Sequence, residues 1–151
     1  MRDDAMYEVT TRTTYPYSAI CYVVCTWADG YSARGSGTVV GPNDILTALH
    51  VVYNANRGGW ATSITVYPGA DTSPFSAPYG SFTNWGRVNG RTTNWDTNGD
   101  GLLSDAEAQY DLALIGMRLM PSIVAMPPVQ PVLTSQHCTP PLAMRSLRRL
   151  P

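Results

Sequence analysis

The chain has 151 residues, of which 44% are hydrophobic and 14% are charged, and its formal net charge is −1. This length and apolar content predict one domain with its own core. A near-neutral charge argues against nucleic acid or an anionic membrane surface as a partner, and no run of about 18 apolar residues predicts a membrane span.

The first 16 residues are polar and are interpreted as a leader that precedes the domain. Asp3, Asp4 and Glu8 stand where a secretory signal peptide needs an apolar stretch, so no signal peptide is predicted. A mobile terminus is the simplest expectation for this part of the chain.

Six short apolar or alternating runs predict strands, separated by turns rich in Gly, Pro, Asn and Asp. In chain order they are residues 19–27, 31–40, 45–49, 60–67, 81–88 and 111–117. Gly35 and Gly37 are expected to weaken or bend the second strand. Residues 51–54 suggest one helical turn, and residues 72–79 suggest a loop. The prediction is an all-β fold, a six-stranded antiparallel β-barrel.

The three cysteines are an odd number, so at least one is unpaired within the chain. Cys21 and Cys25 share a face of one predicted strand, with Cα atoms about 13 Å apart. A disulfide needs less than about 7 Å, so buried free thiols are expected. Nothing supports a pairing of Cys138.

A histidine follows the apolar strand over residues 45–49, and a carboxylate, Asp111, stands at the head of another apolar strand. A single histidine at the end of an apolar strand, such as His50, is more often a hydrogen-bonded core residue than a proton carrier, because short motifs give many false-positive matches. The strand that begins at Asp111 favours the role of proton carrier for His50, since a carboxylate orients and stabilises an imidazole that acts as a base.

Residues 96–107 match the calcium loop of an EF-hand at every position. The predicted ligands are Asp96, Asn98, Asp100, the backbone carbonyl of Leu102, Ser104 and Glu107. Gly101 permits the sharp turn at the sixth position. Calcium takes about six to eight oxygen ligands, so the loop predicts Ca²⁺ as a cofactor. The alternative is an acidic turn without a metal.

The calcium loop is predicted to stand alone rather than in a paired EF-hand. Residues 85–95 contain two glycines and lack helical periodicity, whereas residues 104–110 are expected to form a helical turn. Glu107 stands four residues before Asp111. The hypothesis is that calcium orders this segment and thereby fixes the Asp111 carboxylate against His50.

Three motifs occur in a fixed order, each on a predicted strand. They are Gly35-Ser-Gly-Thr-Val-Val40, Leu46-Thr-Ala-Leu-His50 and Asp111-Leu-Ala-Leu-Ile115. Residues 17–117 thereby resemble the first half of a trypsin-like serine peptidase, within the bacterial glutamyl-endopeptidase-like branch. The resemblance implies the first barrel of that fold, hydrolysis of peptide bonds in protein or peptide substrates, and an extracellular location. It gives His50 the role of general base and Asp111 that of its orienting partner.

The family's nucleophile is the serine of a Gly-Asp-Ser-Gly-Gly segment, and this sequence contains no such segment. Ser122, Ser135 and Ser146 follow Asp111, and none has a neighbouring glycine. In the family the oxyanion hole comes from the same missing segment. The expectation is the N-terminal half of a peptidase domain, inactive as an isolated chain.

Residues 118–151 lack the strand pattern of a second barrel and contain scattered prolines, so an atypical, disordered tail is predicted. Two other functions stay open. One is a non-catalytic calcium-binding β-barrel module, and the other is a non-functional fragment with an exposed apolar face. Substrate specificity is not predicted, because the family builds that pocket in the missing half.

Overall fold

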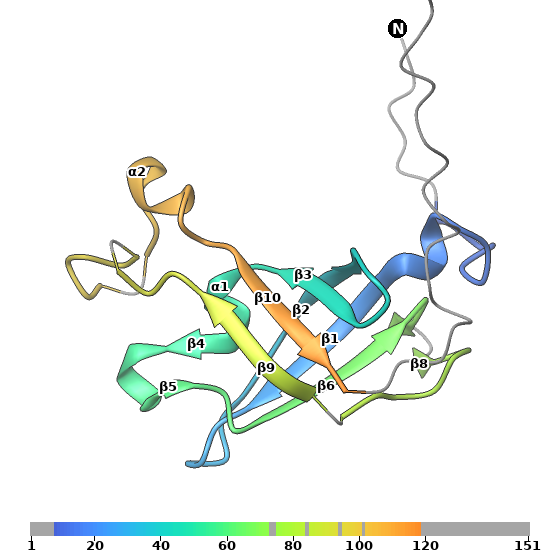
Figure 1. Ribbon diagram of the computed structural model, residues 1–151, viewed down its shortest axis with the longest axis horizontal. Helices are drawn as coiled ribbons and strands as arrows, with labels where there is room; N and C mark the ends of the chain where they lie inside the picture. The colour runs from blue at the N-terminus through green and yellow to red at the C-terminus, as the bar shows by residue number, and fades with distance from the viewer. Residues whose placement is uncertain (1–7, 73–74, 84, 94, 101, 119–151) are drawn as a thin grey trace, which may run out of the picture.

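The computed structural model describes residues 8–118, except residues 73, 74, 84, 94 and 101. Six strands form one antiparallel sheet in the spatial order β6–β1–β2–β3–β10–β9 (Figure 1). They are β1 (Ile20–Thr26), β2 (Ser32–Val39), β3 (Asp44–Thr47), β6 (Ser63–Pro68), β9 (Trp85–Gly90) and β10 (Ala113–Met117). Each overlaps one predicted strand, which confirms the all-β prediction. The predicted tail from residue 119 onward, with Cys138, lies outside the described residues.

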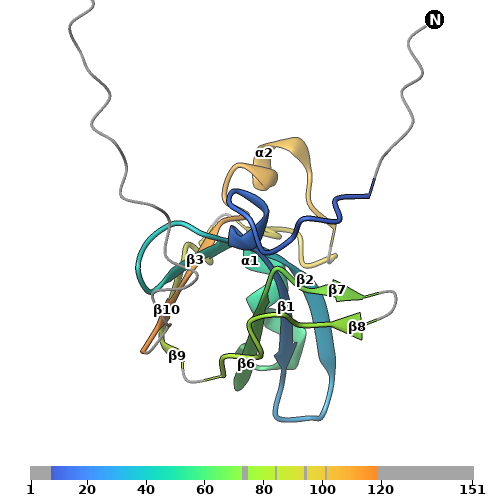
Figure 2. The same ribbon diagram turned by 90° about the vertical axis from the view of Figure 1, so that its right-hand side faces the viewer.

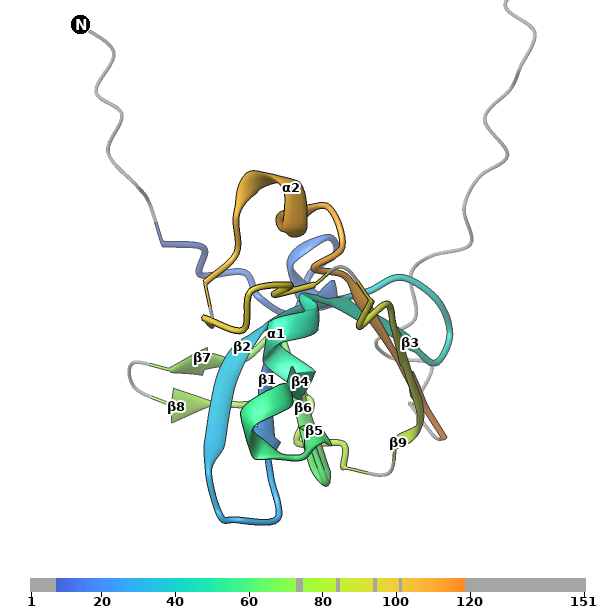
Figure 3. The same cartoon turned by 90° about the vertical axis from the view of Figure 1, so that its left-hand side faces the viewer.

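The sheet curls strongly instead of lying flat (Figure 3). Its two edge strands are β6 and β9. Val66 of β6 exchanges backbone hydrogen bonds of 2.9 Å in both directions with Phe82, on the segment that leads into β9. This bridge ties the two edges together, so the six strands form a curled antiparallel half-barrel.

The concave face of the sheet holds the core. Residues alternate between the two faces of a strand, and β1 follows this rule with three buried residues separated by partly buried ones. The buried side chains of the three strands that contribute most are Cys21, Val23, Cys25, Ile64, Val66, Pro68, Ala113, Ile115 and Met117. The apolar alternation of the sequence therefore selects the face that packs inward.

Cys21 and Cys25 are buried and free, as predicted. Burial raises the pKa of each thiol to about 12, because the apolar surroundings disfavour the thiolate. Both side chains therefore act as small apolar core groups and not as nucleophiles.

Short elements fill the connections between the six strands. They are η1 (Tyr17–Ala19), α1 (Leu49–Val52), β4 (Tyr53–Asn54), η2 (Ala55–Arg57), β5 (Gly59–Trp60), β7 (Asp71–Thr72), β8 (Phe75–Ser76) and α2 (Asp105–Ala108). Helix α1 begins two residues before the predicted turn and so includes His50. The hairpin β7–β8 projects from the sheet (Figure 2), where a loop was predicted. No helix among the described residues is long and apolar enough to cross a membrane.

The described end of the predicted leader is attached to the domain. Arg12 forms an ion pair of 2.7 Å with Asp71 of β7, and the backbone carbonyl of Thr13 accepts a 2.8 Å hydrogen bond from the Tyr79 hydroxyl. A mobile leader was the simplest expectation. The sequence did not reveal these contacts because both partners lie more than fifty residues away along the chain.

Two glycines let α1 lie close against the sheet. A Cβ atom on Gly35 would lie 2.6 Å from Cγ2 of Val51, and one on Gly90 would lie 2.6 Å from Cδ1 of Leu49. Gly35 pairs in regular register with Val23, so β2 continues through this position. The function of Gly35 is to make room for the helix that carries His50.

We predict that Gly90→Ala destabilises the domain by about 1–3 kcal/mol, the usual cost of overpacking a core. The new methyl group would meet the Leu49 side chain and also the backbone oxygen of Leu112 at 3.2 Å, which cannot move alone. Urea unfolding measures the effect. Gly116→Ala is the matched control, since a Cβ there meets nothing closer than 3.5 Å. Equal stability of the two variants would contradict this explanation.

Candidate active site

His50 lies on the exposed side of α1. Its helix neighbours Leu49, Val51 and Val52 are buried, which leaves the imidazole directed outward with 56% of its side chain exposed. These three buried side chains, on both sides of His50 in the chain, thus fix the orientation of a one-turn helix that is too short to be stable alone.

Asp111 lies two residues before β10, the strand that pairs with β3. Ala113 lies opposite Thr47 in this pairing, so the residues just beyond Thr47 and just before Ala113 meet at one end of the two strands. The sheet register therefore brings His50 and Asp111 together although 61 positions separate them.

Both carboxylate oxygens of Asp111 contact His50. Oδ1 accepts a 2.9 Å hydrogen bond from the His50 backbone N–H, and Oδ2 lies 2.7 Å from the ring nitrogen Nδ1. The Asp111 side chain is only 13% exposed, so the pair is shielded on the carboxylate side. Because an ionised carboxylate only accepts hydrogen bonds, Nδ1 is assigned the proton and Nε2 is left as the basic nitrogen.

A groove of about 420 Å³ lies beside His50. One wall is formed by residues 53–56, and the other by Trp95 together with residues 96 and 102–103 of the predicted calcium loop. The rings of Tyr53 and Trp95 meet edge to face with centroids 5.5 Å apart. Sequence analysis did not identify this groove, because its two walls come from distant segments that only the fold brings together.

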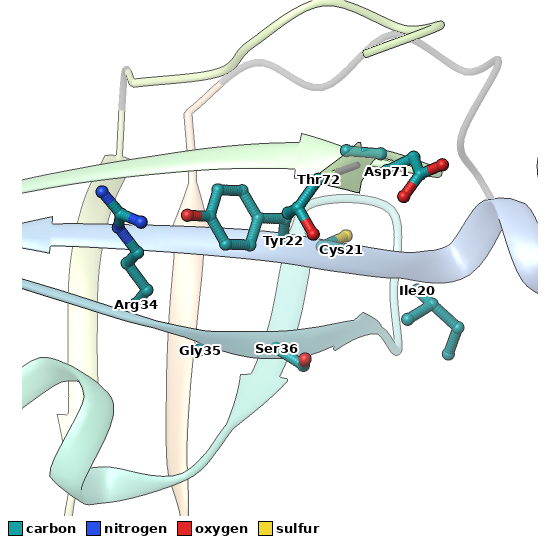
Figure 4. Close-up of a pocket in the computed structure, with 9 residues that line it drawn as sticks. Ile20, Cys21, Tyr22, Arg34, Gly35, Ser36, Asp71 and Thr72 are labelled. Atoms are coloured by element: carbon teal, nitrogen blue, oxygen red, sulfur yellow. The ribbon is translucent and has the colours of Figure 1, made fainter. Parts of the chain in front are cut away.

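A second hollow of about 410 Å³ lies on β1, β2 and β7 and does not include His50. Its lining side chains include Tyr22, Arg34 and Asp71 (Figure 4). Asp71 is already paired with Arg12. This hollow holds no arrangement of acid, base or nucleophile of the kind found at His50.

The predicted calcium loop forms successive side-chain-to-backbone turns. The backbone N–H of Asp100 donates to Oδ1 of Asn98 at 3.3 Å, and that of Leu102 donates to Oδ1 of Asp100 at 2.7 Å. Asp96 has a positive φ of 47° and lines the groove beside His50. The side chains of Asn98 and Asp100 thus each accept a hydrogen bond from the backbone N–H two residues later.

Glu107 differs from the other predicted ligands because it is buried, with 6% of the residue exposed. Its Oε1 accepts hydrogen bonds from the backbone and hydroxyl of Thr97, both at 2.6 Å. Its Oε2 accepts from the backbone of Ser104 at 3.0 Å and from the Ser104 hydroxyl at 2.7 Å. Ser104 and Glu107 form a capping box at the start of α2.

The donor set of the loop suits calcium chemically, since it consists of carboxylate, amide, hydroxyl and carbonyl oxygens. The four hydrogen bonds to Glu107 occupy the acceptor sites of its two oxygens, so bidentate ligation requires both hydroxyls to turn away. Among the described residues, no three or more His, Cys, Asp or Glu side chains are grouped to hold a metal ion.

The hydrogen bonds from Thr97 and then Ser104 lower the pKa of Glu107 to about 2, from an ordinary 4.5. A lowered pKa means that this group stabilises the fold fully above about pH 4.5 and loses its contribution as pH falls toward 2. We predict that, in chelator, Glu107→Gln loses less thermal stability than the native chain between pH 5 and pH 3. Asp105→Asn, in the same exposed helical turn, should keep the native acid dependence. Identical acid dependence in all three proteins would contradict the role of this carboxylate.

No protein-family model matches the chain. In sequence it is 35% identical over 100 residues to an extracellular metalloprotease of Bacillus subtilis, covering 64% of this chain and 31% of that protein. It is 36% identical over 80 residues to the glutamyl endopeptidase of Bacillus licheniformis, covering 52% of this chain and 22% of that protein. The chain therefore spans less than a third of either relative.

A solved structure of a Glu endopeptidase superposes with a TM-score of 0.54 at 29% identity, covering 74% of this chain and 45% of that one. The fold is that of the first barrel of a trypsin-like serine peptidase. A solved collagenase, with a TM-score of 0.50 at 18% identity and coverage of 73% of this chain and 40% of that one, agrees in fold alone. The sequence and structural similarities both point to glutamyl-endopeptidase-like proteins.

Proposed function

We propose that this chain supplies the general base and its orienting carboxylate to a serine endopeptidase of the glutamyl-endopeptidase-like type. The observation that carries the proposal is the contact of both Asp111 oxygens with His50, one at the backbone and one at Nδ1. Among the described residues no hydrogen bond is made to Nε2, and the imidazole is 56% exposed and lines the groove, so Nε2 is within reach of a bound group.

In the proposed reaction, a serine hydroxyl attacks the carbonyl carbon of the scissile peptide bond while Nε2 of His50 takes the hydroxyl proton. The C–N bond then breaks as the same proton passes to the leaving amine, which leaves an acyl-enzyme. Water repeats the sequence, giving its proton to His50 and releasing the new carboxyl end. Asp111 stays ionised throughout and stabilises the imidazolium.

The 151 residues contain no Gly-Asp-Ser-Gly-Gly segment, so we propose that the nucleophile lies outside this sequence. The isolated chain is then inactive. A fluorescent serine-directed phosphonate should leave it unlabelled, while a glutamyl endopeptidase run beside it as the positive control is labelled. Labelling of the isolated chain that survives denaturation and disappears in His50→Ala would contradict the missing nucleophile.

The two sequence relatives carry names of different catalytic classes, a metalloprotease and a glutamyl endopeptidase. The His50–Asp111 contact favours the serine class, because it commits Nδ1 to a carboxylate and presents Nε2 as a base. Phosphonate inhibition of a serine-containing form separates the classes. Insensitivity to phosphonate, with activity lost in chelator and restored by Zn²⁺ alone, would assign the metalloprotease class instead.

We further propose that residues 96–107 bind calcium through the side chains of Asp96, Asn98, Asp100, Ser104 and Glu107 and the carbonyl of Leu102. Supporting this are the agreement of the sequence with the calcium loop at every position and the turns at Asn98 and Asp100. When bound, calcium supplies charge neutralisation for a loop that is rich in carboxylates.

A non-catalytic calcium-binding module is the second candidate, and the missing serine segment is the observation that favours it. Coding sequence after codon 117 that lacks a Gly-Asp-Ser-Gly-Gly segment in every frame would support this module. The peptidase proposal places the protein outside the cell, in agreement with the extracellular relative, and takes protein or peptide as substrate.

A further inference from the structure

Glu107 joins the two ends of the loop over residues 96–107. Through Oε1 it holds Thr97, near the start, and through Oε2 it holds Ser104, near the end. Four donors within 3.0 Å converge on one carboxylate that is 6% exposed. Charge-assisted hydrogen bonds of this kind are about twice as strong as neutral ones, so Glu107 itself ties the two ends of the loop together.

The closed loop continues directly into the segment that carries Asp111. The backbone N–H of Tyr110 donates to the Glu107 carbonyl at 2.9 Å, and that of Asp111 donates to the Ala108 carbonyl at 3.1 Å. Helix α2 has a single turn, and a helix this short depends on its cap to persist. The Glu107 carboxylate is half of that capping box.

The same closure places one wall of the groove beside His50. Thr97 is adjacent to Asp96, and both Asp96 and Trp95 line the groove. On the far side of the loop, Leu102 and Leu103 line it just before Ser104. Holding Thr97 against Ser104 therefore fixes the spacing of the two parts of this wall.

We propose that Glu107 is a positioning residue, which acts through Thr97 and Ser104 to hold Asp111 against His50 and to shape the adjacent groove. The inference rests on the proposed function insofar as His50 is the base that needs orienting. It differs from the calcium hypothesis, because Glu107 closes the loop with its own hydrogen bonds. The His50–Asp111 contact should therefore form in the metal-free protein.

Glu107→Gln is the discriminating substitution because it keeps the size of the side chain. An amide replaces one accepting oxygen by a donating NH₂ group. Whichever way the amide is turned, that group faces a backbone N–H, either of Thr97 or of Ser104. Asp105→Asn is the control, since it removes an exposed carboxylate from the same helical turn without touching the cluster.

The experiment follows the ring N–H proton of His50 by NMR in the full 151-residue chain with EDTA present. We expect the native chain and Asp105→Asn to show a protected proton. In Glu107→Gln we expect it to exchange with solvent at least about ten-fold faster, as the loss of a charge-assisted hydrogen bond implies. Indole N–H shifts of Trp95 should change in the same variant, which reports on the groove wall.

Equal exchange rates in Glu107→Gln and Asp105→Asn would overturn the positioning role and leave the proposed function standing. If the native chain shows no protected ring proton, the His50–Asp111 contact does not form, and this would contradict both the positioning role of Glu107 and the proposed function. If Glu107→Gln does not fold, Thr97→Val removes only one hydroxyl donor. Exchange should then rise by about three-fold or more, and an unchanged rate would overturn the inference.

Discussion

Asp111→Asn is expected to lower kcat by on the order of 10⁴-fold in a form of the protein that includes the serine segment. The asparagine NH₂ group would face Nδ1 of His50, where Oδ2 of Asp111 now lies at 2.7 Å. Nδ1 would then become the acceptor and the proton would move to Nε2. An imidazole protonated at Nε2 cannot take the serine proton, so the base is lost while the site keeps its shape.

Peptide hydrolysis at saturating substrate measures this effect, because KM should change far less than kcat. Asp105→Asn is the matched control, since it neutralises an exposed carboxylate in the neighbouring α2 and should keep full activity. A loss of less than ten-fold in Asp111→Asn would mean that this carboxylate does not set the tautomer of the base.

Calcium at one hundred times its dissociation constant is expected to stabilise the domain by about 2.7 kcal/mol, the linkage expected for one site. For a domain of this size that corresponds to a rise in Tm of roughly 10 °C. The effect requires calcium to bind the folded loop in preference to the unfolded chain, where the carboxylates are far apart. Melting curves with calcium, with magnesium and with chelator provide the measurement.

Asp96→Asn should remove most of the calcium shift, because it takes one charge from the first position of the loop. Asp44→Asn, which changes a carboxylate outside the loop, should keep the shift. Terbium luminescence excited through Trp95, the neighbour of Asp96, gives an independent signal of binding. Identical melting with calcium and with chelator, together with no terbium signal, would leave residues 96–107 as a metal-free turn.

Strand positions and the His50–Asp111 pair were predictable because their signals are local. Short apolar or alternating runs bounded by turn residues identified all six strands, and the order of three short motifs pointed to the pair. The motifs could not predict how close His50 and Asp111 lie, because their contact depends on the register of β3 against β10. The sequence therefore predicted which residues meet but not that both Asp111 oxygens would contact His50.

The parts that sequence reasoning missed depend on packing between distant segments. Gly35 was expected to weaken or bend its strand, and its second role, making room for Val51 of α1, was not predicted. Glu107 was assigned to calcium alone, although Ser104 and Glu107 have the spacing of a capping box, a signal already visible in the sequence. The contact with Thr97 had no such signal, because only the closed loop brings its two ends together.

The most direct test of the catalytic pair is to find which ring nitrogen of His50 carries the proton in the 151-residue chain at pH 9. Nitrogen-15 NMR distinguishes the two ring nitrogens. We expect the native chain to carry the proton on Nδ1 and none on Nε2. In Asp111→Asn we expect the proton on Nε2 instead. A native chain protonated at Nε2, or one unaffected by Asp111→Asn, would contradict this assignment of the proton.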